Sequence, residues 1–305
     1  MSETTAVKSN LEAEAITTVE RGQWALVARR FIRHKLAVVG LGLFVLIILF
    51  AFVMPYFWTW DYKIHPEIPS LTAPSAEHPF GTDKAGRDQL GAVMRATGQS
   101  LKVAFVVALG STVIGALIGA VAGYYRGWVD ALLMRLVDVL FVIPFIVITA
   151  AIAGAIDSSV KWYHMAIILM IFGWLSISRA VRAEVLSLRE KEFIEAARAA
   201  GGSAWHIIVK HLIPNTMSVI IVSVTLQIAF AILSETTLSF LGLGIQSPDT
   251  SLGLLIDAAG ASAFNEQWYL FYIPGFMVIL IALTINFIGD GLRDAMDPRQ
   301  TMVRR

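Results

Sequence analysis

Long uncharged runs of apolar residues recur along this chain, separated by polar segments. A helix needs roughly 20 apolar residues to cross the hydrocarbon core of a bilayer, which is about 30 Å thick. Runs that meet or approach this length cover residues 36–58, 103–125, 139–156, 162–178, 216–234 and 268–289. The fourth is the shortest and contains His164, and the fifth ends at Glu235, although apolar chain continues to Leu243. The pattern predicts six transmembrane helices in an all-α integral membrane protein.

The composition agrees with this pattern. Of the 305 residues, 56% are hydrophobic and only 15% are charged, and the mean hydropathy is +0.68. Soluble domains are nearer half apolar and a quarter charged, so six such runs leave too little polar chain for a water-facing shell. The absence of cysteine excludes a disulfide scaffold, and the net charge of +1 gives no indication of a nucleic-acid partner.

The positions of Lys and Arg predict the orientation of the spans. Seventeen of the 24 lie in segments on the side of the N-terminus, five lie in segments on the other side, and two lie at span edges. Cytoplasmic loops carry the excess of such residues, so we expect both termini in the cytoplasm, as tails of residues 1–35 and 293–305. The first run is too long for a signal-peptide core and has no small-residue cleavage site after it, so it should remain as an anchor.

The segment 59–100 is expected to form an external loop. Four prolines disfavour regular structure in its first half, at positions 66, 69, 74 and 79. Beyond Asp88, the spacing of Leu90, Val93 and Met94 predicts a short interfacial helix that leads into the second span. We expect the loop to pack on the helix bundle, with contact to an external partner as the alternative.

Small residues mark one face of the second span. Gly115, Gly119 and Gly123 follow one another at four-residue spacing, which exposes a strip of backbone. Another helix can approach such a strip closely. The strip therefore predicts helix packing within a bundle and indicates nothing about cargo.

The inside segment 179–214 is much longer than a connection between neighbouring spans requires. Val181, Val185 and Leu188 mark one helical face, and Trp205, Ile208, Val209 and Leu212 mark a second. The small side chains of the intervening Ala-rich stretch, which ends at Gly201-Gly202, would let a partner protein approach closely. We expect two short amphipathic helices that meet at the glycine pair and face the cytoplasm. A pair of helices lying on the membrane surface is the alternative.

The same segment resembles the E-A-A loop of permease subunits in binding-protein-dependent ABC importers. The resemblance rests on Glu195-Ala196-Ala197, three further residues, Gly201, and an apolar stretch that ends at His211-Leu-Ile-Pro214. Other segments are similar to the dipeptide, oligopeptide and nickel permease family. They are His78-Pro-Phe-Gly-Thr-Asp83 with Gly86-Arg-Asp88, Arg135-x-x-Asp138 followed by Pro144, residues 238–244, and residues 289–299. The last is typical of the second, C-type, permease of these systems.

The resemblance implies the type I ABC importer permease fold, with a five-helix core in residues 101–292 that includes the coupling loop. It implies ATPase-coupling roles for Glu195, Ala196, Ala197 and Gly201. The implied partners are a second homologous permease, two ATP-binding subunits and an external substrate-binding protein, in the lipid of a bacterial or archaeal plasma (inner) membrane. The chain has no G-x-x-x-x-G-K-[ST] loop, so we expect no catalytic site and no cofactor on it, with ATP and Mg bound by the ATPase subunits.

Ionisable residues within or beside spans are costly and normally face protein or water. Arg135 and Asp138 are three residues apart and can pair on one helix, and Asp290 lies at the same end of the sixth span. These three are candidates for a structural ion network or a cytoplasmic gate. Glu235 is a candidate for the translocation path, with a buried hydrogen-bonded role as the alternative.

Other functional classes have weaker support. An ion-coupled secondary transporter would need coupling groups near the middle of the membrane and usually a repeated half-fold, and neither is evident. A membrane enzyme would need a catalytic cluster, but the six His are scattered and no H-E-x-x-H occurs, so we expect no metal site. Within the importer class the cargo stays open between peptides, a nickel chelate and other small solutes, with peptides favoured.

Overall fold

The uncharged runs form helices, since only a helix satisfies every backbone polar group within one segment in lipid. A computed structural model describes residues 23–156, 160–260 and 266–296. Within these ranges the regular elements are helices, apart from an isolated bridge between Thr82 and Asp88. The helices up to the middle of the chain are α2 (Gln23–Arg33), α3 (Lys35–Ile48), η1 (Leu49–Val53), η2 (Met54–Tyr56), α4 (Gln89–Tyr125), α5 (Gly127–Val142) and α6 (Phe145–Gly154). Those that follow are α7 (Trp162–Gly173), α8 (Leu175–Leu188), α9 (Glu192–Ala199), α10 (Ala204–Ile207), η3 (Ile208–Leu212), α11 (Ile213–Asn215), α12 (Met217–Phe240), α13 (Leu252–Ala259) and α14 (Tyr269–Met296).

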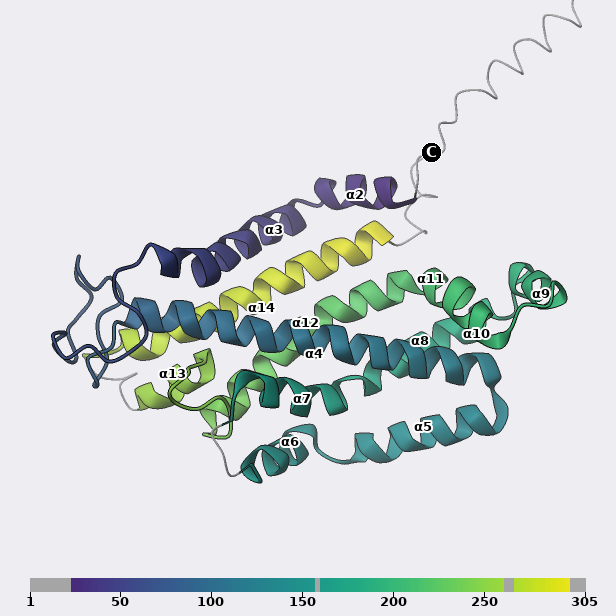
Figure 1. The fold of residues 1–305 in the computed structure, drawn as a ribbon. Coiled ribbons are helices and arrows are strands. Elements are labelled where there is room, and N and C mark those ends of the chain that lie inside the picture. The colour runs from purple at the N-terminus through teal and green to yellow at the C-terminus, as the bar shows by residue number, and fades with distance from the viewer. Residues whose placement is uncertain (1–22, 157–159, 261–265, 297–305) are drawn as a thin grey trace, which may run out of the picture.

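Four continuous helices are long and apolar enough to cross a membrane, and two bent pairs bring the number to six if each pair is one span. The continuous ones are Lys35–Tyr56, α4, α12 and α14. In the bent pairs, α5 and α6 meet at 79°, and α7 and α8 meet at 40°. The described chain is therefore an all-helical bundle with four to six candidate spans (Figure 1).

The third predicted run, 139–156, is not one straight helix. α5 ends at Val142, and Ile143 adopts an extended conformation with φ −77° and ψ 123°. Pro144 has no backbone N–H and disfavours helical geometry in the residue before it, which accounts for the break. α5 also begins well before the uncharged run, at Gly127. The hydrophobic pattern predicted that this segment is apolar enough to enter the membrane, but it did not predict the bend between α5 and α6.

The expected interfacial helix and the second span are a single helix. α4 has 37 residues and begins directly after Asp88, whose carboxylate accepts a hydrogen bond from the Gly91 N–H. The side chains of Leu90, Val93 and Met94, whose spacing predicted a short interfacial helix, are buried. The helix continues unbroken because its buried face continues into the membrane run.

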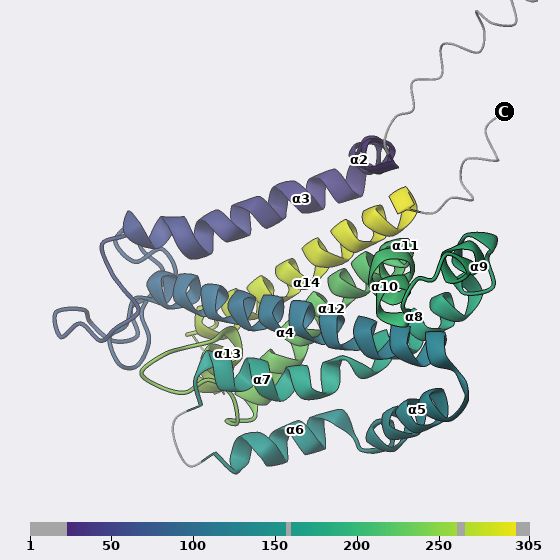
Figure 2. The same cartoon turned by 45° about the vertical axis from the view of Figure 1, so that its right-hand side comes forward.

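α4 lies at the centre of the bundle and packs against α7, α8 and α12 (Figures 1 and 2). The glycine strip faces α8, as the spacing predicted. A Cβ on Gly115 would lie 2.8 Å from the Trp174 carbonyl oxygen, and one on Gly123 would lie 2.8 Å from Val185 Cγ1. At Gly119 the added atom would collide with the carbonyl oxygen of Ser178. The strip therefore brings two helix backbones together, the approach that small residues permit in lipid.

Part of the predicted N-terminal tail is helical. Residues 1–22 of the tail, like residues 297–305 of the C-terminal one, lie outside the described residues, but α2 packs against the end of α14. Arg30 donates to the Ala295 carbonyl oxygen at 3.4 Å, and His34 Nε2 lies 3.5 Å from Asp294 Oδ2. The segment contains basic residues, which do not interrupt an amphipathic helix.

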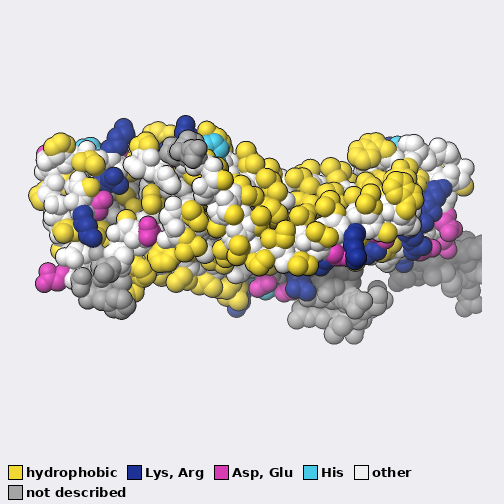
Figure 3. Space-filling view, turned by 90° about the horizontal axis from the view of Figure 1, so that it is seen from below, with side chains coloured by type: hydrophobic (Ala, Val, Ile, Leu, Met, Phe, Trp, Pro, Cys, Tyr) yellow, Lys and Arg dark blue, Asp and Glu magenta, His cyan; other side chains and the backbone are white. Residues whose placement is uncertain are grey.

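The surface agrees with immersion in lipid. Figure 3 shows apolar side chains over the middle of one face, with the charged side chains gathered toward its ends. Exposed apolar side chains in the middle of this bundle include Leu109, Val113, Leu132, Val147 and Leu233. Contiguous apolar surface of this kind marks a membrane or protein interface.

Candidate functional site

A compact helical knob, defined as residues 192–215, projects at one end of the bundle beyond α8 (Figures 1 and 2). It contains α9, α10, η3 and α11 in succession. Ser203 caps α10, because its hydroxyl accepts a hydrogen bond from the His206 N–H at 3.3 Å. The knob corresponds to the helix pair that the sequence predicts.

A left-handed glycine ends α9. Gly201 has φ +82°, and its N–H donates to the Arg198 carbonyl oxygen at 2.9 Å. The N–H of Gly202 reaches back to the Ala197 carbonyl oxygen at 3.0 Å. These two bonds form a Schellman motif, which terminates a helix and fixes the direction of the next segment. A Cβ on Gly201 would meet nothing within 4 Å, so backbone conformation alone demands glycine there.

The knob is seated on the bundle by apolar contacts. Ile194, Ile207, Ile208 and Leu212 are buried in one cluster with side chains of α4 and α8. The Arg198 guanidinium lies 5.3 Å from the ring centroid of Tyr124, at the end of α4. Because the seat joins the knob to both helices, displacement of the knob is resisted by buried apolar area.

The second predicted apolar face is only half buried. Ile208 and Leu212 are buried, but Trp205 is 60% exposed and Val209 42% exposed. The expected spacing assumes one continuous α-helix, whereas Trp205 lies in the short α10 and Ile208–Leu212 form the π-helix η3. Phe193 is exposed as well, so the knob presents two exposed aromatic side chains, Trp205 and Phe193.

The outward face of the knob carries the predicted coupling residues. Glu195 and Ala196 are exposed, Ala197 is half-buried, and Gly201 is exposed at the turn. Among the residues that the structure describes, the Glu195 carboxylate has no hydrogen bond or ion pair. Within the described residues the carboxylate therefore makes no contact that holds the knob together, and it is available to another molecule.

Ion pairs join the helices beneath the knob. Arg182 of α8 donates to both carboxylate oxygens of Asp130 in α5, at 2.5 and 2.6 Å. Arg126 Nη2 lies 2.9 Å from Glu190 Oε1. Bidentate geometry fixes orientation as well as distance, so the Asp130 pair sets how α5 lies against α8. Sequence reasoning did not select this pair, because its partners are far apart in the chain.

The predicted Arg135–Asp138 pair is not formed. Asp138 Oδ1 instead lies 2.6 Å from Arg179 Nη2, and the Arg179 guanidinium lies 4.2 Å from the Phe141 ring centroid. The described chain gives Arg135 and Asp290 no ion pair, and both are exposed. The cation that pairs with Asp138 comes from Arg179 of α8 and not from Arg135, which lies three positions away on the same helix. The three predicted residues do not form one network in this structure.

Glu235 is fully buried in α12. Its carboxylate accepts hydrogen bonds from Ser100 and Ser239, each at 2.8 Å. Nearby, Asp249 accepts from Arg95 at 2.9 and 3.1 Å and from Gln99. The structure therefore shows the buried, hydrogen-bonded arrangement that was the alternative to a place on an open path.

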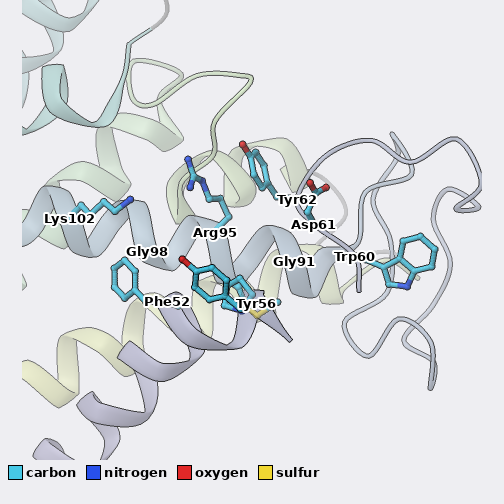
Figure 4. A pocket seen from close by; sticks show the side chains of 12 residues that line it. Phe52, Tyr56, Trp60, Asp61, Tyr62, Gly91, Arg95, Gly98 and Lys102 are labelled. Carbon is cyan, nitrogen blue, oxygen red and sulfur yellow. The ribbon is translucent and has the colours of Figure 1, made fainter. Parts of the chain in front are cut away.

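A cavity of about 290 Å³ lies at the opposite end of the bundle, between the N-terminal part of α4 and the segment 51–62. Figure 4 shows Arg95 and Lys102 extending from the same side of α4, with Tyr62 and Phe52 beside them. The Arg95 guanidinium is 5.0 Å from the Tyr62 ring centroid. Arg95 in the wall of this cavity is already paired with Asp249.

The segment 78–88 encloses a buried carboxylate. Besides capping α4, Asp88 accepts from Trp58 Nε1 at 2.9 Å, and its other oxygen lies 2.9 Å from His78 Nδ1. Tyr269 donates its hydroxyl to the carbonyl oxygens of Thr72 and Thr82, at 3.0 and 3.1 Å. This segment packs on the bundle, as expected. In the described ranges no group of three or more His, Asp or Glu is arranged to hold a metal ion.

The sequence of this chain is similar to known families and proteins. Residues 115–302 match the family described as "Binding-protein-dependent transport system inner membrane component". Residues 22–74 match the N-terminal TM domain of oligopeptide transport permease C. Similar proteins include the oligopeptide transport system permease protein OppC of Mycobacterium tuberculosis, 41% identical over 92% of this chain and 96% of the relative. The dipeptide transport system permease protein DppC of Alkalihalophilus pseudofirmus is 38% identical over 90% of each chain.

A solved structure shares the fold. A chain of the methionine ABC transporter MetNI, in an inward-facing conformation, superposes with a TM-score of 0.57 over 68% of this chain and 97% of that chain, at 19% identity. The family match covers the knob, and the identity to the named relatives extends over nearly the whole sequence. The chain belongs to the family of inner membrane components of binding-protein-dependent transport systems.

Proposed function

We propose that this chain is the C-type permease subunit of an ATP-driven peptide importer. It forms the pathway together with a second, related permease, and an external binding protein delivers the peptides. Similarity to OppC and DppC over at least nine tenths of the chain supports peptide cargo. The described chain carries one knob, so a second permease would supply the contact for a second ATPase subunit.

The observation that carries the coupling role is the unpartnered Glu195 carboxylate beside exposed Ala196 on a knob seated by Ile194. The apolar seat transmits force to α4 and α8, while the small side chain lets an ATPase surface approach closely. Glu195 supplies a charge for that surface. ATP and Mg bind to the ATPase subunits, whose closure moves the knob and the helices beneath it.

The test is ATP-driven uptake by the whole transporter in proteoliposomes. With Glu195→Ala we expect assembled complexes in which peptide uptake and peptide-stimulated ATPase activity fall together by about tenfold, as loss of a charged interface contact implies. Glu192→Ala is the matched control, because Glu192 is also exposed in the first turn of α9. Normal activity of Glu195→Ala, or equal losses in both variants, contradicts the coupling role.

The proposal predicts which end of the bundle faces the cytoplasm. Ser203 lies in the knob and Ser247 lies in the segment after α12, and both are exposed. Because the chain has no cysteine, Ser203→Cys and Ser247→Cys each introduce a single thiol into it. We expect an impermeant thiol reagent on intact cells to label Ser247→Cys and leave Ser203→Cys unlabelled until the cells are opened. The reverse pattern would place the knob and both termini outside.

A separate experiment addresses the competing class. The permease alone, in liposomes with an imposed proton or sodium gradient and without ATP, is expected to show no peptide uptake. Uptake under these conditions would replace the importer proposal with an ion-coupled transporter.

A further inference from the structure

Positive charge is in excess where the ends of α4 and α8 meet the knob. Arg126 directly follows α4, Arg189 directly follows α8, and Arg198 lies in α9. Arg126 Nη2 lies 2.9 Å from Glu190 Oε1, and Arg189 Nε lies 3.5 Å from the same oxygen. Within the described residues, no other carboxylate pairs with these three arginines, which we call the arginine cluster. Three guanidinium groups are thus offset by one carboxylate.

Tyr124, near the end of α4, brings two members of the cluster together. Arg189 Nη1 donates to the Tyr124 carbonyl oxygen at 2.5 Å, and the Arg198 guanidinium lies 5.3 Å from the Tyr124 ring centroid. Burial lowers the pKa of the Arg189 guanidinium, and the positive charges of Arg126 and Arg198 lower it further. The opposing effect of Glu190 does not cancel these causes, so an anion bound beside the cluster would relieve the repulsion.

Arg126 has a backbone conformation that only glycine adopts readily. Its φ is +57° and its ψ is −163°. Strained residues of this kind persist where the surrounding structure holds them, and they cluster at functional sites. The Arg126 side chain remains 48% exposed while it reaches Glu190, so the strained turn between α4 and α5 presents a guanidinium group at the surface.

The cluster lies at the boundary of the membrane-spanning part of α4. The uncharged run 103–125 ends directly before Arg126. Next to it, Tyr125 and Trp128 are exposed, and such aromatic side chains are enriched at the level of the lipid headgroups. Exposed Leu132 and Leu136 follow Trp128 at four-residue spacing, which gives α5 an apolar outer face that leads to the cluster.

A phospholipid phosphate fits these features together. Guanidinium groups bind phosphate oxygens in a bidentate manner, and basic pockets between transmembrane helices bind anionic headgroups. An acidic residue of an ATPase subunit would match the charge but not the apolar face of α5. The Arg198 guanidinium also lies against the end of α4, whereas Glu195 marks the exposed side of the knob that we assign to the ATPase.

We propose that the arginine cluster binds the phosphate group of an anionic phospholipid, whose acyl chains lie along the exposed apolar face of α5. The bound phosphate offsets the excess charge between the knob and the ends of α4 and α8, and so stabilises the knob on its seat. The inference goes beyond the proposed function, because lipid binding at this site does not depend on the cargo.

The test is the thermal unfolding midpoint of the whole transporter in detergent micelles that contain phosphatidylcholine. Added phosphatidylglycerol should raise the midpoint in a saturable manner, because a ligand that binds the folded state stabilises it. With Arg126→Gln we expect the apparent affinity for phosphatidylglycerol to fall at least about tenfold, the scale of one hydrogen bond between charged groups. Arg198→Gln should behave alike and serves if the first variant fails to assemble.

Arg29→Gln is the matched control. Arg29 is an exposed arginine of α2, at the same end of the bundle as the knob, and has no ion pair within the described residues (Figure 1). It should leave the affinity unchanged, whereas general attraction to anionic micelles would make it equivalent to Arg126. Glu190→Gln should act in the opposite direction and raise the affinity several-fold, because it removes the carboxylate that offsets the cluster.

A soluble phosphate distinguishes a lipid site from a simple anion site. Glycerol phosphate at the same concentrations as the lipid should not raise the midpoint, and an equal rise would overturn the inference. Unchanged affinity in both Arg126→Gln and Arg198→Gln, or an equal loss in Arg29→Gln, would also overturn it. If the arginine variants release the ATPase subunits and keep their affinity for phosphatidylglycerol, the cluster is a protein contact instead. Absence of peptide uptake by the unaltered transporter would overturn only the proposed function.

Discussion

Replacing Gly201 with valine is expected to reduce ATP-driven uptake by at least about tenfold while the transporter still assembles. Gly201 occupies the left-handed region at φ +82° and closes the Schellman motif at the end of α9. A β-branched residue in this region is strained by roughly 1–3 kcal/mol, so the turn reopens and the exposed face of the knob changes direction. Uptake and peptide-stimulated ATPase activity are measured together in proteoliposomes.

A graded series separates backbone strain from side-chain size. No heavy atom of the described residues lies within 4 Å of a Cβ added at Gly201, so this Cβ itself meets no steric obstacle there. Asparagine tolerates left-handed geometry, and Gly201→Asn should therefore retain much more activity than Gly201→Val. If the two variants are equally impaired, the loss comes from the side chain blocking the partner surface. Normal uptake by Gly201→Val would show that the turn is not needed for coupling.

The Asp88→Ala substitution is expected to destabilise the permease at the N-terminal end of α4 by about 2–5 kcal/mol. It removes the cap of α4, worth roughly 1 kcal/mol, and leaves the half-buried Trp58 N–H without its acceptor, which costs about 1–3 kcal/mol more. The partner of buried His78 is lost as well. The midpoint of thermal unfolding of the detergent-purified complex and the yield of monodisperse protein should both fall.

Asp257→Ala provides the comparison, because Asp257 is an exposed carboxylate on α13 and has no hydrogen bond or ion pair within the described chain. It should behave as the unaltered protein. Asp88→Asn keeps an oxygen acceptor and should lie between the two. A normal unfolding midpoint for Asp88→Ala would mean that the segment 78–88 does not hold the N-terminal end of α4.

The periodicity of apolar residues predicted where helices lie but not how they bend. The runs ending near Tyr125 and Gly289 correspond to parts of α4 and α14, because burial in lipid and burial in protein require the same apolar composition. The run 139–156 concealed the sharp break at Pro144, since hydrophobicity carries no information about direction. Trp205 was placed on a buried face because it is apolar and in phase with Ile208 and Leu212, but its side chain is 60% exposed in the structure.

Some residues of the candidate site could be predicted from the sequence, and others could be recognised only in the structure. Glu195, Ala196 and Gly201 could be selected because they lie within one short segment with a family-typical spacing. The partners of Asp138 and Asp88 could not, because Arg179 and Trp58 come close only after helices distant in sequence have packed. The members of the arginine cluster indicated only the orientation of the chain, since the ends of α4 and α8 and the knob bring them together only after folding.

The unbroken length of α4 has a mechanical consequence. At 1.5 Å per residue its 37 residues extend about 55 Å, nearly twice the thickness of the hydrocarbon core. The helix is held by Asp88 at its N-terminal end and packs through Gly119 and Gly123 against α8, beside the knob. Because α4 is one continuous helix, its two ends are stiffly connected. A tilt of the end beside the knob would therefore be carried to the end held by Asp88.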